Sequence, residues 1–199
     1  MQSSAEYSIL FVLKLNESLK LCVNYKALNN IMIKNNYSLL LISELQNRLQ
    51  RAQWFTKFNI LEAFNWIQIK EEDKWKTVFH TRLEHYEYLI MSFNLINASV
   101  MFQTFVNNVL RRYLNQFIIV YLNDILVYSK TKKEHVQHVR KVLQTLKKVD
   151  LRIKSGKSEF HVQSVQFLRF IITFQSLWMN LKKIEVVTTW STSKSKIEV

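Results

Sequence analysis

Residues 117–129 are Phe-Ile-Ile-Val-Tyr-Leu-Asn-Asp-Ile-Leu-Val-Tyr-Ser. Two apolar runs, rich in β-branched and aromatic side chains, flank Asn123 and Asp124, which is the pattern of two strands joined by a tight turn. Asn and Asp are among the residues that occupy the positive-φ positions of two-residue hairpin turns. The segment therefore predicts a buried hairpin that presents a carboxylate at its turn. From these residues alone, the alternative is a turn that is polar only for solubility.

Strand-like and helix-like patterns alternate on both sides of this hairpin. The periodicity predicts one or two strands over 12–25, a helix over 39–49, a strand over 54–60, a hairpin over 77–91, helices over 97–114 and 131–149, and a late strand or hairpin arm over 165–174. Asn97 is the expected N-cap of the second helix, and Thr131 with Glu134 forms a capping box at the start of the third. The third helix is expected to bury Val136, Val139, Leu143 and Leu146.

Composition excludes several classes of protein. The 199 residues fit one domain or two closely fused subdomains, and a hydrophobic share of 48% is enough for a core. One Gly and no Pro exclude glycine-rich phosphate loops, dinucleotide fingerprints and proline-rich or Gly/Ser linkers. A single cysteine, Cys22, excludes an internal disulfide framework and a cysteine zinc site. A reducing, intracellular compartment fits this cysteine content.

The charge balance points to a polyanionic partner. Lys and Arg number 28 against 15 Asp and Glu, a formal net charge of +13, which attracts nucleic acid or an anionic membrane. No apolar run reaches the roughly 18 residues that a membrane span needs. Residues 1–7 lack the order of a signal peptide. Nucleic acid is therefore the expected partner, and a membrane is not.

Five ordered motifs carry a family resemblance. They are Leu19-Lys-Leu-Cys-Val-Asn-Tyr-Lys-Ala-Leu-Asn29, Phe55-Thr-Lys-Phe-Asn-Ile60, the segment 93–103, Tyr121-Leu-Asn-Asp124 and Phe167-Leu168, with further matches at 70–73 and 85–88. Together they resemble the reverse transcriptase domain of a gypsy-type LTR retrotransposon, from about residue 3 to the end of the chain. The resemblance implies an α+β fold, a right-hand polymerase with a palm whose antiparallel sheet is backed by helices.

The same resemblance implies a division into subdomains. Fingers would comprise about 1–33 and 67–97, the palm about 34–66 and 98–182, and 183–199 the start of a truncated thumb or connection. Without a full thumb, protease, RNase H or integrase, the chain is expected to be a polyprotein fragment or a decayed copy. Intact relatives carry RNase H and integrase in the same Pol polyprotein and work in a cytoplasmic particle or the nucleus.

The family's chemistry requires carboxylates that this chain has largely lost. Relatives extend a primer on an RNA or DNA template with deoxynucleoside triphosphates, using two Mg²⁺ ions about 3.5–4 Å apart. Their three aspartates fall on Asn59, Asn123 and Asp124, so Asp124 alone keeps its charge. The loss is expected to cost on the order of 10⁴-fold in rate or more. The alternative is that another carboxylate compensates, with Glu62 the nearest in sequence.

Further positions carry family roles one by one. Lys14 and Lys20 match the fingers cations that close on the triphosphate, and Phe64 matches the aromatic residue that blocks a ribose 2′ hydroxyl. Gln103 matches a residue that contacts the template strand. Lys157 is near the position of a lysine proposed to protonate pyrophosphate. Ordinary explanations stay open for each: a solvated charge for the lysines, core packing for Phe64, and a polar helix face for Gln103.

Phe167 and Leu168 match the primer-grip hairpin. Next to them and elsewhere in the chain, residues that the family usually has are replaced, and most of the replacements are of one kind. Relatives usually have Gly at the positions of Ala63, Glu84, Asn94 and Arg169. They usually have Pro at the positions of Ser38, Leu40, Ser92 and Ser99, and Asp at the position of Asn24. Each Asp→Asn, Gly→Glu or Arg, and Pro→Ser or Leu change is a single G-to-A or C-to-T transition. We therefore expect a silenced copy with a marginally stable fold, strained at Asn94 and Arg169 where positive φ is expected.

Two other functions remain open from the sequence. The domain is either a nucleic-acid-binding remnant that holds a primer–template without extending it, or a pseudogene product with no cellular role. His135 and His138 are spaced to share a metal on one helix face, but no third ligand is apparent, and an exposed helix surface is the expectation.

Overall fold

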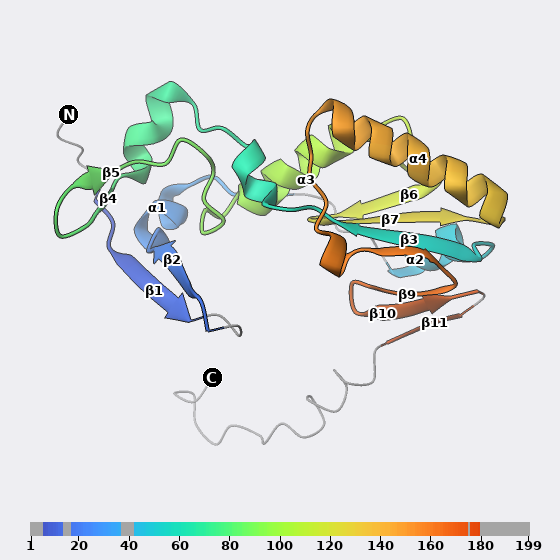
Figure 1. Ribbon diagram of the computed structural model, residues 1–199. Coiled ribbons are helices and arrows are strands. Elements are labelled where there is room, and N and C mark those ends of the chain that lie inside the picture. Colours follow the sequence, from blue (N-terminus) through green and yellow to red (C-terminus); the bar gives the residue numbers. More distant parts are fainter. Residues whose placement is uncertain (1–5, 14–16, 37–41, 175, 180–199) are drawn as a thin grey trace, which may run out of the picture.

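The computed structural model describes residues 6–13, 17–36, 42–174 and 176–179. The helices are α1 (Lys26–Ile31), α2 (Ile42–Leu49), α3 (Ala98–Val109) and α4 (Lys132–Lys148), with 3₁₀ turns η1 (Ala63–Trp66), η2 (Glu71–Thr77) and η3 (Ser155–Lys157). The strands are β1 (Ile9–Leu13), β2 (Leu19–Val23), β3 (Trp54–Asn59), β4 (Phe79–His80), β5 (His85–Tyr86), β6 (Ile118–Tyr121), β7 (Asp124–Ser129), β8 (Glu159–Val162), β9 (Ser164–Phe167), β10 (Phe170–Thr173) and β11 (Ser176–Met179). They form two lobes (Figure 1).

The larger lobe is built on a four-stranded antiparallel sheet. Its order is β6-β7-β3-β8. β3 and β7 pair in register along their whole length, from Trp54 opposite Ser129 to Asn59 opposite Asp124. β9, β10 and β11 form a second, three-stranded sheet. The apolar alternation of β3, β6 and β7 places large side chains on both faces, because successive residues of a strand point to opposite sides.

Each face of the main sheet has its own core. On one face, Phe58, Ile125 and Val127 pack against α3 and α4. On the other face, Phe55 and Leu126 pack with residues of α2, β9 and β10. Figure 1 shows this layering, with α3 and α4 above the sheet and the β9–β11 sheet below it. The parity of the strands therefore assigns Thr56 and Ser129 to the α4 face, and Lys57, Asn59 and Asp124 to the opposite face.

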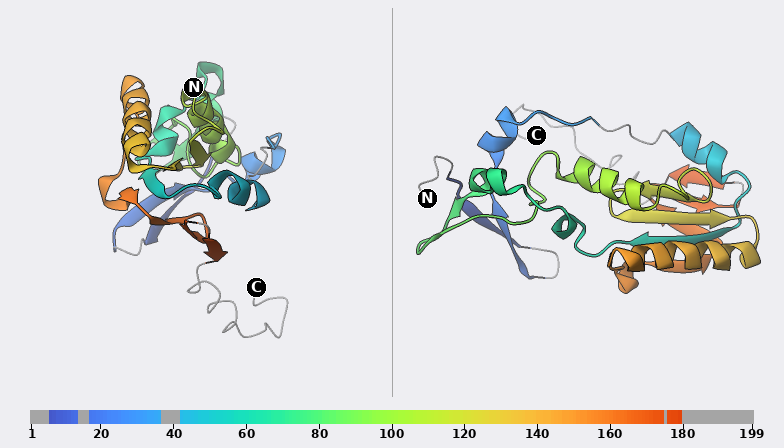
Figure 2. Two further views of the ribbon diagram at one scale, coloured as in Figure 1. Left: turned by 90° about the vertical axis from the view of Figure 1, so that its right-hand side faces the viewer. Right: turned by 90° about the horizontal axis from the view of Figure 1, so that it is seen from above.

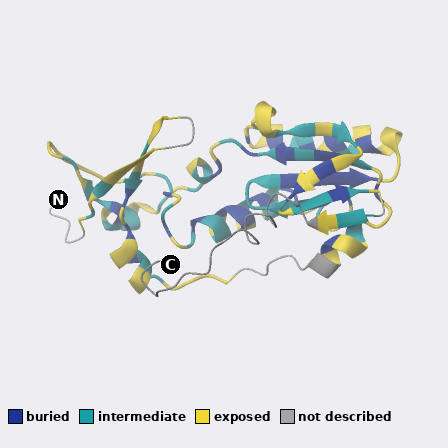
Figure 3. Ribbon diagram, turned by 90° about the horizontal axis from the view of Figure 1, so that it is seen from below, coloured by how far each residue is buried: buried dark blue, intermediate teal, exposed yellow. Residues whose placement is uncertain are grey.

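The smaller lobe joins the β1–β2 ribbon to α1 and the β4–β5 hairpin (Figure 2). Its core includes Val23, Tyr25 and Leu28, joined by Leu95 and Ala98 from the start of α3. The Tyr25 hydroxyl donates to the carbonyl of Thr77 at 2.8 Å. The outer part of the ribbon is exposed (Figure 3), including several apolar side chains such as Phe11. Among the residues described, no helix combines the length and the apolar character needed to cross a membrane.

Most expected elements are confirmed. The segment 165–174 is a hairpin, β9–β10, and the hairpin expected over 77–91 is reduced to two short strands, β4 and β5. The expectations for 14–16, 39–41 and 183–199 fall outside the described residues. The capping prediction holds at Thr131, whose hydroxyl accepts from the amide of Glu134. It is wrong for the Asn97 side chain, which makes no cap at its helix and instead bonds the backbone of Asn35 and Ile33.

The buried stripe of α4 matches the prediction at Val139 and Leu146 and differs from it at the two other positions. Val136 was expected in the core and is 40% exposed. His135 is buried instead, together with Val139, Val142 and Leu146. The apolar pattern of the helix is compatible with burying either Val136 or His135. Polar groups on β3 and β7 decide which of the two faces the sheet, as described below.

The strained positions also differ from expectation. The turn between β6 and β7 consists of Leu122 and Asn123, because Tyr121 pairs with Asp124. The positive φ, 51°, is on Leu122, and the Leu168 backbone has a φ of 59°. Neither Asn94 nor Arg169 is among the described residues with positive φ, so the prediction of strain at those two positions is wrong. Beside Arg169, the residue with the left-handed backbone is Leu168.

Candidate active site

The three residues that replace the expected metal ligands lie together. Asn59 ends β3, Asp124 begins β7, and the two are register partners. The side-chain amide of Asn59 donates from Nδ2 to Oδ1 of Asp124 at 2.7 Å. The carbonyl of Asn123 accepts the Ile60 amide at 2.8 Å, which holds the turn against the end of β3. The antiparallel pairing thus brings together residues 65 positions apart in the chain.

The donor set does not fit a pair of Mg²⁺ ions. Magnesium prefers charged oxygen ligands in octahedral geometry, and the cluster supplies one carboxylate, of which one oxygen accepts a hydrogen bond from Asn59. The Oδ1 of Asn123 is buried and has no hydrogen-bond partner in the described part of the chain. It is the one neutral oxygen that could be added to this carboxylate as a ligand. Among the described residues, no group of three or more His, Cys, Asp or Glu side chains could hold a metal.

Glu62 does not complete this set. Its side chain is exposed and accepts from the Asn65 amide, Nδ2 to Oε2, at 3.3 Å. Its backbone has a positive φ of 50° at the start of η1. The carboxylate is therefore held by its own turn, and the alternative that it compensates for Asn59 finds no support in the geometry.

A groove of about 600 Å³ opens beside the cluster. Its lining includes Lys57, Asn59, Asp124, Lys157 and Glu159. Lys57 is paired with Glu159 and also donates to the carbonyl of Gln166 at 2.9 Å. Lys157 has no ion pair in the described part of the chain and is exposed. The groove therefore presents one free cation beside a carboxylate that already accepts a hydrogen bond.

The loop that carries Lys157 is tied to Asn59. The amide of Lys154 donates to the Asn59 carbonyl at 2.8 Å, and the Asn59 amide donates to the Ser158 hydroxyl at 3.2 Å. Ser158 in turn donates to the Lys154 carbonyl at 2.9 Å. Hydrogen bonds on both sides of η3 thus hold the loop of Lys157 near the end of β3.

The two residues matched to the primer grip have different surroundings. Phe167 is fully buried in the core shared with α2. Leu168 follows it at the turn between β9 and β10 and lines the groove. The hairpin thus uses Phe167 as its anchor and presents Leu168 toward the groove.

The structure gives Gln103 a supporting role that the sequence did not predict. Its side chain is buried, and its Oε1 accepts from the backbone amide of Leu122 in the β6–β7 turn. Its Nε2 donates to the carbonyl of Val120 and to Asn107, both at 3.1 Å. Gln103 therefore supports the turn that carries Asn123 from underneath. A buried Gln on an otherwise apolar helix face was the available signal, since buried amides are nearly always bonded.

The remaining predicted residues do not line the groove as described. Phe64 packs in η1 against Phe102 of α3, with ring centroids 6.0 Å apart. Lys20 on β2 places its ammonium 3.1 Å from the ring centroid of Phe93, a cation–π contact within the smaller lobe. Lys14 lies outside the described residues.

The expectation that His135 and His138 form an exposed helix surface is wrong. His135 is completely buried, and the side chain of His138 is only 14% exposed. His135 contacts the ring of His161, for which the sequence offered no partner. Hydroxyl groups at the facing positions of β3 and β7 make this burial possible, and a helix pattern alone contains no information about them.

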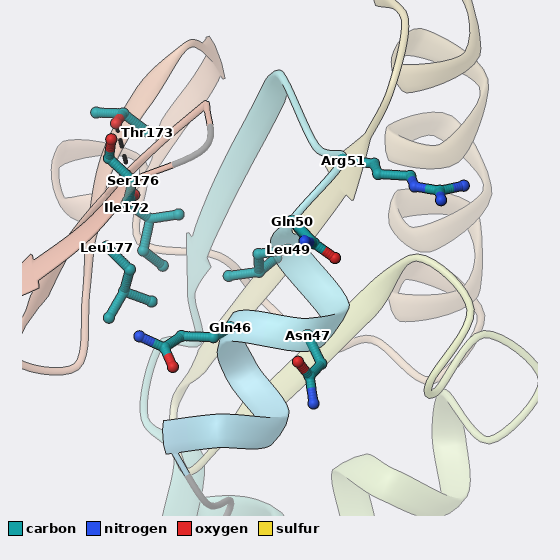
Figure 4. A pocket seen from close by; sticks show the side chains of 9 residues that line it. All are labelled: Gln46, Asn47, Leu49, Gln50, Arg51, Ile172, Thr173, Ser176 and Leu177. Carbon is teal, nitrogen blue, oxygen red and sulfur yellow. Dashed lines mark hydrogen bonds between the residues drawn. The ribbon is translucent and has the colours of Figure 1, made fainter.

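A second cavity of about 620 Å³ lies between α2 and the β10–β11 hairpin (Figure 4). Its polar lining consists of Gln46 and Asn47 on α2, Gln50 and Arg51 just beyond the helix, and the hydroxyl residues Thr173 and Ser176 on the hairpin. It contains no carboxylate and shares no lining residue with the groove at Asn59 and Asp124. Of the two hollows, the groove is therefore the one that contains positions of the expected metal ligands.

Comparison with known proteins identifies the family. The profile of the family described as reverse transcriptase (RNA-dependent DNA polymerase) matches residues 14–172, so this chain belongs to the reverse transcriptase family. The Transposon Tf2-3 polyprotein of Schizosaccharomyces pombe is 34% identical over 191 residues, which are 96% of this chain and 14% of that protein. The Transposon Tf2-7 polyprotein of the same species is 33% identical with the same coverage. The origin in an LTR retrotransposon polyprotein is confirmed.

Solved structures confirm the fold. The foamy viral protease–reverse transcriptase dRH in complex with double-stranded DNA has a TM-score of 0.85 at 19% identity, covering 100% of this chain and 35% of that one. The foamy viral protease–reverse transcriptase in complex with an RNA/DNA hybrid has a TM-score of 0.80 at 19% identity, covering 97% of this chain and 26% of that one. The α+β polymerase fold expected from the sequence is therefore correct. The chain spans about one seventh of the curated relatives that it matches.

Proposed function

We propose that this domain holds a primer–template as a reverse transcriptase domain does, but transfers nucleotides far more slowly than an intact relative. The observation that carries the proposal is the 2.7 Å hydrogen bond from Asn59 Nδ2 to Asp124 Oδ1. In an intact centre, two bound Mg²⁺ ions would activate the primer 3′ hydroxyl and hold the triphosphate. Here an amide takes the place of a ligand and donates to the carboxylate that remains.

Binding depends on different residues from catalysis. The Asn substitutions remove no positive charge: the chain has a net charge of +13, and Lys157 keeps its ammonium in the groove. The substrate classes that we assign are an RNA or DNA template with its primer and deoxynucleoside triphosphates. The relatives bound to double-stranded DNA and to an RNA/DNA hybrid support the first of these.

The lobes and the remaining residues take the family's roles in this proposal. The smaller lobe is the fingers, and Lys14 and Lys20 are the cations that we assign to the triphosphate from their match to the family. The larger lobe is the palm, with Leu168 at the primer and Phe64 on the sugar side of the nucleotide. Gln103 acts through the turn that it supports, because its amide bonds Leu122 and Val120.

A primer-extension assay tests the catalytic half. Purified chain, with Mg²⁺ and then with Mn²⁺, is compared with the double variant Asn59→Asp/Asn123→Asp. We expect extension by the double variant and a rate lower by on the order of 10⁴-fold for the natural chain. Equal extension by both proteins would show that the carboxylate argument is wrong. If neither protein extends the primer, the defect lies outside this cluster.

Fluorescence anisotropy with a labelled primer–template tests the binding half. We expect binding that weakens steeply with salt, since phosphate contacts release counterions. Lys157→Gln should weaken binding more than the matched control Lys133→Gln, because Lys133 lies on the exposed start of α4. Binding that is independent of salt, or equal effects of the two variants, would contradict a phosphate contact in the groove.

A further inference from the structure

A row of three imidazoles and two hydroxyls lies on the face of the sheet opposite the groove. His135 of α4 is at its centre and is completely buried. Its Nε2 lies 2.8 Å from the Thr56 hydroxyl on β3. Its Nδ1 lies 3.0 Å from the Ser129 hydroxyl on β7. One side chain of the helix therefore bonds both central strands.

The row continues in both directions. The Ser129 hydroxyl lies 2.8 Å from Nδ1 of His138, whose ring stacks on Phe117 at a centroid distance of 3.8 Å. On the other side, the Thr56 hydroxyl accepts from the backbone amide of His161 at 3.0 Å. The rings of His161 and His135 meet edge to face at 5.2 Å. The buried Nδ1 of His161 has no hydrogen-bond partner among the described residues.

The arrangement suits a neutral His135. A neutral imidazole donates from one ring nitrogen and accepts at the other, so one of its two hydroxyl partners donates to it. A protonated ring donates from both nitrogens, and the hydroxyl that had donated must then turn its proton away. The charge would also be buried with no carboxylate within hydrogen-bonding distance of the ring among the described residues. Burial, together with His161 and His138, lowers the pKa of His135 to about 4.

The two strands held by His135 are the strands that carry the candidate site. Thr56 lies three residues before Asn59 on β3, and Ser129 lies five residues after Asp124 on β7. Because β3 and β7 pair in register between these points, a change in their attachment to α4 is transmitted along the pair to the groove. No other polar side chain of α4 in the described structure bonds both strands.

We propose that His135 is a positioning residue for the candidate site, which as a neutral imidazole fastens α4 to β3 and β7, and which releases the helix from these strands when it is protonated. This role does not depend on the proposed function, since it requires no substrate. It gives the domain a sensitivity to acid that its exposed histidines, His80 and His85, do not share.

The surrounding charges are consistent with one dominant titration. His161 from β8 and His138 from α4 face His135. His138 itself has a pKa lowered by burial and by Lys141, with Glu134 acting in the opposite direction. The small cavity against which His138 lies is lined by Arg48, Arg51 and Lys130 as well as Glu134. From β3 and β7, the groups that face His135 are the uncharged hydroxyls of Thr56 and Ser129 and the backbone of Phe55, whose hydrogen bond acts to raise the pKa of His135.

Hydrogen–deuterium exchange of the natural chain near neutral pH and at about pH 5, corrected for the intrinsic exchange rate, tests the proposal. We expect the protection factors of the backbone amides of α4 and of β7 to fall by at least about tenfold at the lower pH. The variant His135→Phe keeps the ring volume without a titrating group, so it should show lower protection at neutral pH and little further change in acid. His80→Gln, on the exposed β4–β5 hairpin, should keep the response of the natural chain.

Imidazole NMR supplies a second readout that does not need a folded variant. The His135 signals should titrate well below the ordinary range of histidine, and the side-chain amide signals of Asn59 and Asn123 should shift with the same midpoint. A His135 that titrates near 6.5, the ordinary value, would overturn the proposal. So would a full acid response in His135→Phe, or site amides that ignore the His135 titration.

Discussion

Asn59 and Asp124 are register partners on the two central strands, and the amide of one donates to the carboxylate of the other at 2.7 Å. This hydrogen bond stabilises the negative charge of Asp124, which a metal ion would otherwise have to neutralise. Two facing carboxylates at this distance would repel, and the pKa of one would rise. The substitution therefore leaves a site that is stable without metal.

Changing this one residue back should make stability depend on Mg²⁺. Asn59→Asp is expected to lower the free energy of unfolding by about 1–3 kcal/mol in a chelator, since it replaces a hydrogen bond by like charges. Mg²⁺ should restore part of this loss in the variant and leave the natural chain unchanged. Urea unfolding with and without Mg²⁺ measures both effects. A variant as stable as the natural chain in chelator would show that the 2.7 Å hydrogen bond contributes little.

Gln103 provides the second prediction. Gln103→Leu should destabilise the domain by about 1–3 kcal/mol, because the Leu122 amide and the Val120 carbonyl lose a buried partner. Asn108→Ala on the exposed side of α3 is the matched control and should change stability by less than about 0.5 kcal/mol. Equal effects of the two variants in urea unfolding would contradict the supporting role of Gln103.

Leu122 provides the third prediction. Its φ of 51° is a left-handed conformation, which costs a residue with a Cβ roughly 1 kcal/mol. Leu122→Gly should therefore be neutral or stabilising by up to about 1 kcal/mol, although glycine has the larger chain entropy. Val120→Gly, in the neighbouring strand, should be clearly destabilising. A comparable loss at both positions in thermal or urea unfolding would show that the leucine side chain matters more than the backbone.

Local apolar patterns predicted the strands β3, β6 and β7. The site cluster was predicted by the resemblance of the ordered motifs to reverse transcriptases, because the family's three aspartates fall on Asn59, Asn123 and Asp124. Antiparallel pairing then brings Asn59 to Asp124 without further information. The expected fold class followed from the same motifs in order along the chain.

The features that escaped prediction depend on partners far away in the sequence. His135 is buried because Thr56 and Ser129, 79 and 6 residues away, offer hydroxyls to its ring. The phase of α4 follows from these bonds, which is why Val136 points outward. Similarly, the strain at Leu122 depends on which residues pair across the turn, and the abundance of Asn pointed to its neighbour instead.

The last prediction concerns pH. Burial lowers the pKa of His135 to about 4 in the folded chain, from its ordinary value of 6.5. The unfolded chain therefore binds the extra proton between these two values. The contribution of His135 to the free energy of unfolding is therefore fully present above pH 6.5 and is lost as the pH falls toward 4. The loss amounts to about 3 kcal/mol. The lowered pKa of His138 acts in the same direction.

Urea unfolding at several pH values between about 4.5 and 7.5 measures this loss. In His135→Phe the slope over the range should be shallower, while His80→Gln should reproduce the slope of the natural chain. Carboxylates contribute to acid unfolding in all three proteins equally, so the difference between the slopes isolates the imidazole. Parallel slopes in the natural chain and in His135→Phe would mean that the pKa of His135 is the same in the folded and unfolded chains, which would contradict the lowering that its burial implies.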